Sequence, residues 1–176
     1  MFDKLWELLQ HIWDNINPFF IIPEYAQGLL LRCGKFNKIC EPGIHIKCPF
    51  IDELIVQHTV QTTVSLSAQS LFTIDGTNIV VRGMVKYKIS DIKVFLLEVF
   101  DAVDAIADVS QGIIKQIVMS KTTKECMDNE LDNTITKKCR VEIKKMGVEV
   151  IQVTLTDIAP IRSIRLINDT FSSKLD

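Results

Sequence analysis

Hydrophobic and polar residues recur with two different periods along the chain, and the first 16 residues follow the helical period. On a helix with about 100° per residue, the apolar side chains of this segment fall within an arc of roughly 120°. The stripe consists of Phe2, Leu5, Trp6, Leu9, Ile12, Trp13 and Ile16. Charged and amide side chains take the opposite side, so the pattern predicts an amphipathic helix.

A short apolar segment bounded by Pro18 and Pro23 follows this stripe. It consists of Phe19, Phe20, Ile21 and Ile22. Neither piece can cross a bilayer, which takes about 20 consecutive apolar residues. The segment 1–23 therefore predicts a membrane-associating unit in one leaflet, with the apolar loop entering behind the helix. The alternative is that the stripe docks on its own domain or on a neighbouring subunit.

The residues after this segment change to a strand-like pattern. Strands are expected over 26–33 and 54–66, and residues 79–89 alternate between an apolar face and a partly charged face. Turns are expected at Gly34-Lys35, Glu41-Pro42-Gly43 and Asp75-Gly76. Of these, Asp75-Gly76 is the strongest hairpin signal in the sequence.

The pattern then becomes helical. Asp91 can cap a short helix through 94–97, and a longer helix follows. Its inward stripe consists of Val103, Ile106, Ala107, Ile113, Ile114, Ile117 and Val118. Gly112 lies within this helix at a cost of about 1 kcal/mol relative to Ala, which suggests close packing at that position.

A third helix is expected over 124–146, where Gly147 ends it. Its inward positions are Met127, Leu131, Ile135, Cys139, Ile143 and Met146. A strand over 148–157 and a short helix over 161–174 complete the pattern. Strands precede helices and a strand follows them, so the sequence predicts an α+β fold with a mostly antiparallel sheet.

Composition narrows the class of protein. The chain has 176 residues, about one domain's worth, with 47% apolar and 24% charged residues, which is ordinary globular usage. The net charge of −2 provides no basic field for a nucleic acid. The five cysteines are scattered, and no secretory signal precedes them, which favours a reducing compartment. A disulfide scaffold, a DNA-binding protein and a multi-pass membrane protein are all disfavoured.

Metal binding and catalysis find little support in the sequence. Cys33, Cys40, His45 and Cys48 lie within 16 residues, but their spacing is not one of the usual zinc patterns, so free thiols are expected. No phosphate-binding or dinucleotide-binding glycine pattern is present in the sequence. We therefore expect no metal, no cofactor and no catalytic residue, and the chain is not expected to be an enzyme.

Cations crowd the end of the third predicted helix. They are Lys137, Lys138, Arg140, Lys144 and Lys145, opposed locally by Glu142 alone. Cations at a helix C-terminus complement the helix dipole and remain solvated, which is the simpler interpretation. The sharper interpretation is a patch for an acidic lipid or an acidic partner.

Several short motifs resemble those of one family, in the right order and spacing from about residue 24 to 160. They are Glu24-Tyr25 with Gly28-Leu29-Leu30-Leu31-Arg32, Glu41-Pro42-Gly43-Ile44-His45 with Pro49-Phe50, Thr73-Ile74-Asp75-Gly76-Thr77 with Tyr87-Lys88-Ile89-Ser90-Asp91, and Gly147-Val148-Glu149-Val150 with Asp157-Ile158. Together they are similar to the stomatin–prohibitin–flotillin (SPFH, band-7) domain. The resemblance implies an SPFH domain over 24–158, between the membrane-associating segment 1–23 and a short C-terminal helix or tail over 159–176.

The resemblance also implies a function. SPFH proteins are non-catalytic, membrane-associated oligomers that organise lipids and hold or regulate membrane proteins such as channels and proteases. The expected partners are membrane lipids, further copies or a longer SPFH relative, and a membrane-protein client, with the domain on the cytoplasmic side. Family members usually continue into a long Ala/Glu-rich helix, which does not follow Pro160 here, so lateral association of domains is expected rather than cages built on that helix. The alternative function is a regulatory module whose N-terminal aromatic face binds a membrane protease or channel.

Overall fold

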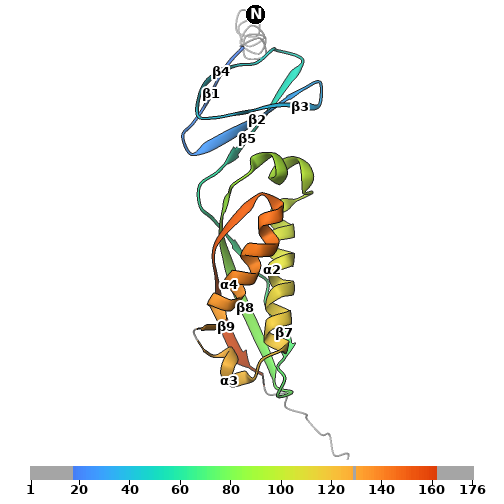
Figure 1. The fold of residues 1–176 in the computed structure, drawn as a ribbon, viewed down its shortest axis with the longest axis vertical. Helices are drawn as coiled ribbons and strands as arrows, with labels where there is room; N and C mark the ends of the chain where they lie inside the picture. The colour runs from blue at the N-terminus through green and yellow to red at the C-terminus, as the bar shows by residue number, and fades with distance from the viewer. Residues whose placement is uncertain (1–17, 129, 162–176) are drawn as a thin grey trace, which may run out of the picture.

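Two lobes lie end to end in the computed structural model, which describes residues 18–128 and 130–161 (Figure 1). A small lobe contains the first five strands, and a larger lobe contains the remaining strands and all described helices. Each lobe has its own cluster of buried apolar side chains. The expected helix over 2–16 and residues 162–174 of the expected C-terminal helix lie outside the described residues.

The small lobe is built from two antiparallel layers of strands. β2 (Ala26–Arg32) lies between β3 (Lys35–Cys40) and β5 (Asp52–His58), and β1 (Phe19–Ile22) pairs with β4 (Gly43–Ile46) in a separate two-stranded ribbon. The lobe's buried cluster consists of Ile22, Ala26, Leu30 and Cys40, with Phe20 and Leu54 packed against it. β1 is thus an integral strand of this lobe.

The sheet of the larger lobe is organised around one long strand. β8 (Asn78–Ile89) pairs along one side with β9 (Val148–Pro160) and along the other with β6 (Thr62–Ser65) and β7 (Gln69–Phe72), always antiparallel. Burial alternates strictly along β8 from Ile79 to Ile89. The expected period of two in this segment is therefore confirmed, and with it the mixed α+β class.

Helices cover the sheet of the larger lobe. α2 (Ala102–Met119) and α4 (Glu130–Ile143) supply most of the helical core residues, and α4 lies between α2 and β9 (Figure 1). Three short elements flank or connect these helices: η1 (Val94–Glu98, a π-helical turn) lies between β8 and α2, α3 (Thr123–Cys126) between α2 and α4, and η2 (Lys144–Met146, 3-10) between α4 and β9.

Local signals correctly marked several ends of these elements. The Asp91 carboxylate accepts hydrogen bonds from the backbone N–H groups of Lys93 (2.9 Å) and Val94 (3.2 Å), as a helix cap does. Gly147 ends η2 with a φ of 74°, in the left-handed region that favours glycine. Asp75 and Gly76 lie in the turn that joins β7 to β8.

Two expected elements are divided in the structure. The strand expected over 54–66 is two strands, β5 and β6, which belong to different lobes and are separated by residues 59–61. The helix expected over 124–146 is divided into α3, α4 and η2, and Met127 is 55% exposed in the break rather than inward. Asp128 precedes α4, and the Asp side chain favours helix starts over helix interiors.

Gly112 does not mark close packing. The residue is exposed, and a Cβ built on it meets no atom within 4 Å. The expectation of a tight helix contact at this position was wrong, because at about 100° per residue position 112 lies opposite the apolar stripe, on the side of the helix that faces solvent.

A β-bulge explains a change of phase in β9. Val148 and Val150 are buried at even positions, whereas Val153 is buried at an odd one. The pairing steps from Tyr87–Val150 to Lys86–Gln152, so Ile151 is the extra residue that shifts the alternation.

Candidate membrane-facing surface

The β1–β4 ribbon presents one apolar face to solvent. Residues on alternate positions of a strand share a face, and the cross-strand pairs Phe19–Ile46 and Ile21–Ile44 lie on this one. The exposed fractions are 58% for Phe19, 75% for Ile21, 73% for Ile44 and 63% for Ile46. Four large apolar side chains thus form a contiguous surface, which we call the ribbon face. Contiguous apolar patches of this kind mark sites of interaction.

The opposite face of the ribbon is anchored to the small lobe. Ile22 is only 2% exposed and belongs to the buried cluster. Phe20 packs against the same cluster and stacks on the His45 ring, with centroids 5.5 Å apart. His45 Nε2 lies 2.6 Å from the Glu41 carbonyl oxygen, which orients the ring. The ribbon face is therefore held outward by a packed inner face.

A short loop after β4 adds a further exposed aromatic residue. Phe50 is 86% exposed and has a φ of 74°, a left-handed conformation that is costly for a residue with a Cβ. Asp52 holds the loop closed: its carboxylate accepts from the Cys48 N–H at 2.8 Å, and its own N–H donates to the Cys48 carbonyl at 3.1 Å. Arg32 donates to both Asp52 carboxylate oxygens, at 2.8 and 3.0 Å.

The environment of Asp52 keeps it ionised. The hydrogen bond from Arg32, followed by that from the Cys48 backbone, lowers the pKa of Asp52 from 3.8 to about 2. The side chain of Asp52 is fully covered, whereas that of Arg32 is half exposed. The pair fixes the end of β2 to the start of β5 and so sets the position of Phe50.

The sequence predicted only part of this surface. Of its membrane-binding residues, those over 2–16 lie outside the described part of the chain. Phe19 and Ile21 lie on the ribbon face, but Phe20 and Ile22 point into the lobe, so Ile22 is not accessible to a lipid. Ile44, Ile46 and Phe50 were missed. Ile44 and Ile46 alternate with His45 and Lys47, which was a strand signal, but nothing local identified β1 as their partner.

The ribbon lies at the end of the molecule where the chain enters the small lobe (Figure 1). No helix within residues 18–128 and 130–161 is long and apolar enough to span a membrane. The fold and this surface can now be compared with known proteins.

The family model described as "SPFH domain / Band 7 family" matches residues 20–166. This match covers most of the chain. The chain belongs to the SPFH family.

Named relatives support this assignment at low identity. Protein HflK of Haemophilus influenzae is 26% identical over 159 residues, which is 88% of this chain and 38% of that protein. An uncharacterised protein of Methanocaldococcus jannaschii is 24% identical over 152 residues, 85% of this chain and 76% of the relative. Protein HflC of Buchnera aphidicola is 34% identical over 80 residues, 42% of this chain and 24% of its own length. The chain therefore spans well under half the length of these two Hfl proteins.

The predicted cation cluster of this SPFH domain lies on α4 and η2, in the larger lobe. Its members do not form one uniform patch. The Lys145 ammonium lies 2.9 Å from the Glu142 carboxylate, and Arg140 is engaged by the backbone of β9. Lys137, Lys138 and Lys144 are exposed on the helix surface. Because α4 belongs to the lobe distant from the ribbon, these cations and the ribbon face do not form one site (Figure 1).

Three polar residues of α4 cover the outer edge of β9. The Arg140 guanidinium donates to the carbonyls of Val150 (2.9 Å) and Ile151 (2.6 Å). The Thr136 hydroxyl accepts from the Val153 N–H at 3.0 Å and lies 3.3 Å from the Val153 carbonyl oxygen. They satisfy backbone groups of a long edge strand that would otherwise be open to pairing with another chain.

Asp132 completes this row. Its carboxylate accepts from the Leu155 N–H at 3.3 Å, and burial raises the pKa of Asp132 above its ordinary value. Positions 132, 136 and 140 are four apart, so one side of α4 supplies all three side chains. The sequence analysis assigned Arg140 to the cation cluster and missed this role.

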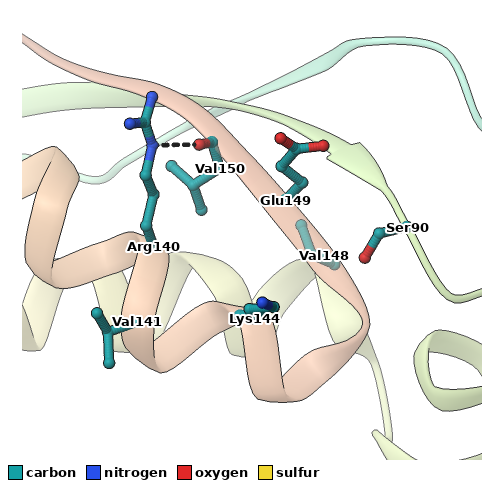
Figure 2. Close-up of a pocket in the computed structure, with 7 residues that line it drawn as sticks. All are labelled: Ser90, Arg140, Val141, Lys144, Val148, Glu149 and Val150. Carbon is teal, nitrogen blue, oxygen red and sulfur yellow. Dashed lines mark hydrogen bonds between the residues drawn. The ribbon is translucent and has the colours of Figure 1, made fainter.

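A hollow lies between α4 and the start of β9 (Figure 2). It has a volume of about 750 Å³, and its lining combines apolar side chains with charged ones. The lining residues are Ser90, Arg140, Val141, Lys144, Val148, Glu149 and Val150.

The cysteines are all free thiols in the described structure. Cys33 and Cys48 are exposed, whereas Cys40, Cys126 and Cys139 are buried. Burial raises the pKa of Cys139 to about 11, so this thiol stays protonated and unreactive near neutral pH. Among the described residues, no three His, Cys, Asp or Glu side chains gather as metal ligands would.

Proposed function

We propose that this SPFH protein is a non-enzymatic peripheral membrane scaffold, which binds one leaflet through its N-terminal end and organises lipids or membrane proteins as an assembly of copies. The ribbon face carries this proposal. It exposes more than half of the surface of Phe19, Ile21, Ile44 and Ile46 on one face of a ribbon whose other face packs on the lobe. Together with the apolar stripe of residues 2–16, it supplies a membrane-binding end.

The size of the ribbon face favours assembly. Transfer of one such side chain from water to hydrocarbon contributes on the order of 1–2 kcal/mol when part of it is already covered. Four of them provide about 4–8 kcal/mol, which corresponds to millimolar to micromolar affinity for one copy. Linked copies bind far more tightly, because each further attachment is intramolecular.

The arrangement of the lobes determines how the proposed scaffold is oriented on the bilayer. With the ribbon face on the bilayer, the larger lobe projects away from it, and the surfaces of α2, α4 and β9 remain available to other copies or to a client protein (Figure 1). The free thiols of the five cysteines suit the reducing cytoplasmic side. The partners in this proposal are membrane lipids, further copies or a longer SPFH relative, and a membrane-protein client.

Co-flotation of the full chain with liposomes tests the proposal. Replacing Ile21 and Ile46 by Glu charges the ribbon face at two positions that are not directly opposite each other, and we expect flotation to fall at least tenfold. Phe72→Glu with Ile74→Glu is the matched control, since these residues are 60% and 67% exposed beside β7 at the other end of the molecule. Trp6→Glu with Trp13→Glu tests the predicted helical stripe in the same way.

The same experiment separates the alternative function. A regulatory module that binds a membrane protease or channel through its N-terminal face would not float without that partner. Wild-type protein that remains at the bottom of the gradient with liposomes of neutral and acidic composition would contradict the scaffold proposal and favour a protein partner for the ribbon face.

A further inference from the structure

The most exposed aromatic side chain of the described residues is far from the ribbon. Phe100 is 99% exposed in the connection between η1 and α2. Leu97 and Val103, three residues to either side, are 42% and 39% exposed. We call these three residues the Phe100 knob. A fully exposed Phe flanked by further exposed apolar side chains contributes nothing to its own fold, so the knob is a candidate contact for another molecule.

Acidic side chains surround the knob. Glu98, Asp101 and Asp104 are all exposed within the seven residues that contain Phe100. A binding site for the knob must therefore combine an apolar pocket with positive charge at its rim.

The hollow between α4 and β9 has this composition. Val141, which is 64% exposed, provides the accessible apolar wall over the buried Val148 and Val150. Arg140 and Lys144 provide two cations against the single carboxylate of Glu149 (Figure 2). The hydrogen bonds to Val150 and Ile151 fix the Arg140 guanidinium in place. The volume of about 750 Å³ is several times that of a phenylalanine side chain.

The knob and the hollow lie on different sides of the same lobe. The knob adjoins the start of α2, the hollow adjoins β9, and α4 separates α2 from β9 (Figure 1). Both lie at the end of the lobe nearest the ribbon, since η1, just before the knob, contacts η2, just after α4. One copy can therefore present its knob to the hollow of the next.

We propose that the Phe100 knob of one copy inserts into the α4–β9 hollow of a second copy, with Glu98 and Asp104 facing Arg140 and Lys144. This inference rests on the assembly in the proposed function and names its contact. Such a contact is head-to-tail, and repetition generates a row or ring. The small lobes of all copies then lie on one side, where every ribbon face reaches the same bilayer. Because α4 side chains cover the outer edge of β9, a second copy cannot add a strand at this edge, and the contact must be made by side chains.

Engineered disulfides test this contact in the full chain on liposomes, with Cys33 and Cys48 replaced by Ser. One chain carries Val103→Cys, which leaves Phe100 in place, and a second carries Val141→Cys, both at exposed positions. Under catalysed oxidation, we expect crosslinks between these two chains at least tenfold above those between Val103→Cys and a Phe72→Cys control. Crosslinking no greater than the control would overturn the proposal, whether the chains assemble differently or remain monomers.

Charge reversal provides the second measurement. Asp104→Lys and Lys144→Glu should each reduce the assembled mass seen by mass photometry, and the two changes combined should restore it. Failure of the combined variant to recover contradicts the charge pairing. Flotation of the Phe100→Ser variant distinguishes the two proposals. A variant that binds liposomes but does not assemble supports both proposals. Wild-type protein that does not float contradicts the scaffold function itself, whatever the result for the knob.

Discussion

At the scale of single residues, the small lobe depends on one buried carboxylate. Asp52 receives hydrogen bonds from Arg32 and from the Cys48 backbone, and through them it connects the end of β2, the Phe50 loop and the start of β5. The alternation of apolar residues gave no indication of this role, because Asp52 acts through hydrogen bonds to Arg32 and to a backbone N–H rather than through apolar packing. The spacing of Arg32 and Asp52, 20 residues apart, becomes meaningful only when β2 and β5 are paired.

Asp52 predicts a specific dependence of stability on pH. Its pKa is about 2 in the folded chain against an ordinary 3.8, so the unfolded state binds the proton more readily. The stabilisation is therefore present above about pH 4 and is lost as pH falls through about 2. We expect Asp52→Asn to lower thermal stability at neutral pH and to flatten the decline in acid. Glu53→Gln, in the same strand, is the control that should retain the wild-type decline.

Two glycines predict opposite effects on stability. Gly112→Ala should raise the free energy of unfolding by about 1 kcal/mol, since the new methyl group meets nothing and Ala favours the helix. Gly147→Ala should lower it, because φ is 74° and the new Cβ would lie 2.5 Å from the Asp91 carbonyl oxygen. Denaturant unfolding of both variants checks this. A stabilised Gly147→Ala, or a destabilised Gly112→Ala, would contradict the packing described for these positions.

At the scale of elements, α4 both packs on the sheet and covers its edge. Asp132, Thr136 and Arg140 reach the outward backbone groups of β9, so the helix side chains replace a neighbouring strand. The sequence could predict α4 from its periodicity and β9 from its alternation. It could not predict that polar side chains of α4 hydrogen-bond to the backbone of β9, because that contact depends on how the two elements pack.

Thr136→Val tests this coverage with an almost isosteric change. The Val153 N–H loses its partner in a buried setting, which costs about 1–3 kcal/mol. We expect denaturant unfolding to show that loss and hydrogen exchange at the Val153 amide to accelerate. Thr134→Val on the same helix is the matched control, since its hydroxyl bonds only to the Glu130 carbonyl. Equal effects of the two variants would exclude a special role for the edge contact.

Local pattern predicted β2, β8, β9 and the segments that contain β5, β6, α2 and α4, but it did not predict the short strands β1, β3, β4 and β7 or any strand's partner. β8 was predictable because each alternate residue contacts the same core. The division of 54–66 was not, since β-branched residues continue while the chain passes from the β2 sheet to the β8 sheet. The sequence predicted two residues of the ribbon face, Phe19 and Ile21. It could not predict Ile44 and Ile46, because they join this face only through the pairing of β1 with β4.

At the scale of the whole molecule, the proposed membrane contact and the proposed contacts between copies lie on different lobes. The small lobe carries the ribbon face at one end, and the larger lobe carries the Phe100 knob and the α4–β9 hollow at its sides. Lys93 lies over the Phe36 ring at 5.2 Å, a cation–π contact between the lobes that helps to fix their relative orientation. The proposed membrane contact at one end and the proposed lateral contacts of the larger lobe suit an assembly whose copies stand side by side on a bilayer.

Depth-dependent fluorescence quenching tests the membrane contact most directly. A polarity-sensitive fluorophore on Ile44→Cys, in a chain with Cys33 and Cys48 replaced by Ser, reports the environment of the ribbon face. The same label on Phe72→Cys reports the opposite end. With liposomes, we predict a blue shift and quenching by lipid-borne quenchers at position 44 and neither change at position 72. A label at position 44 that stays in water while the protein is bound would contradict the proposed membrane-facing surface.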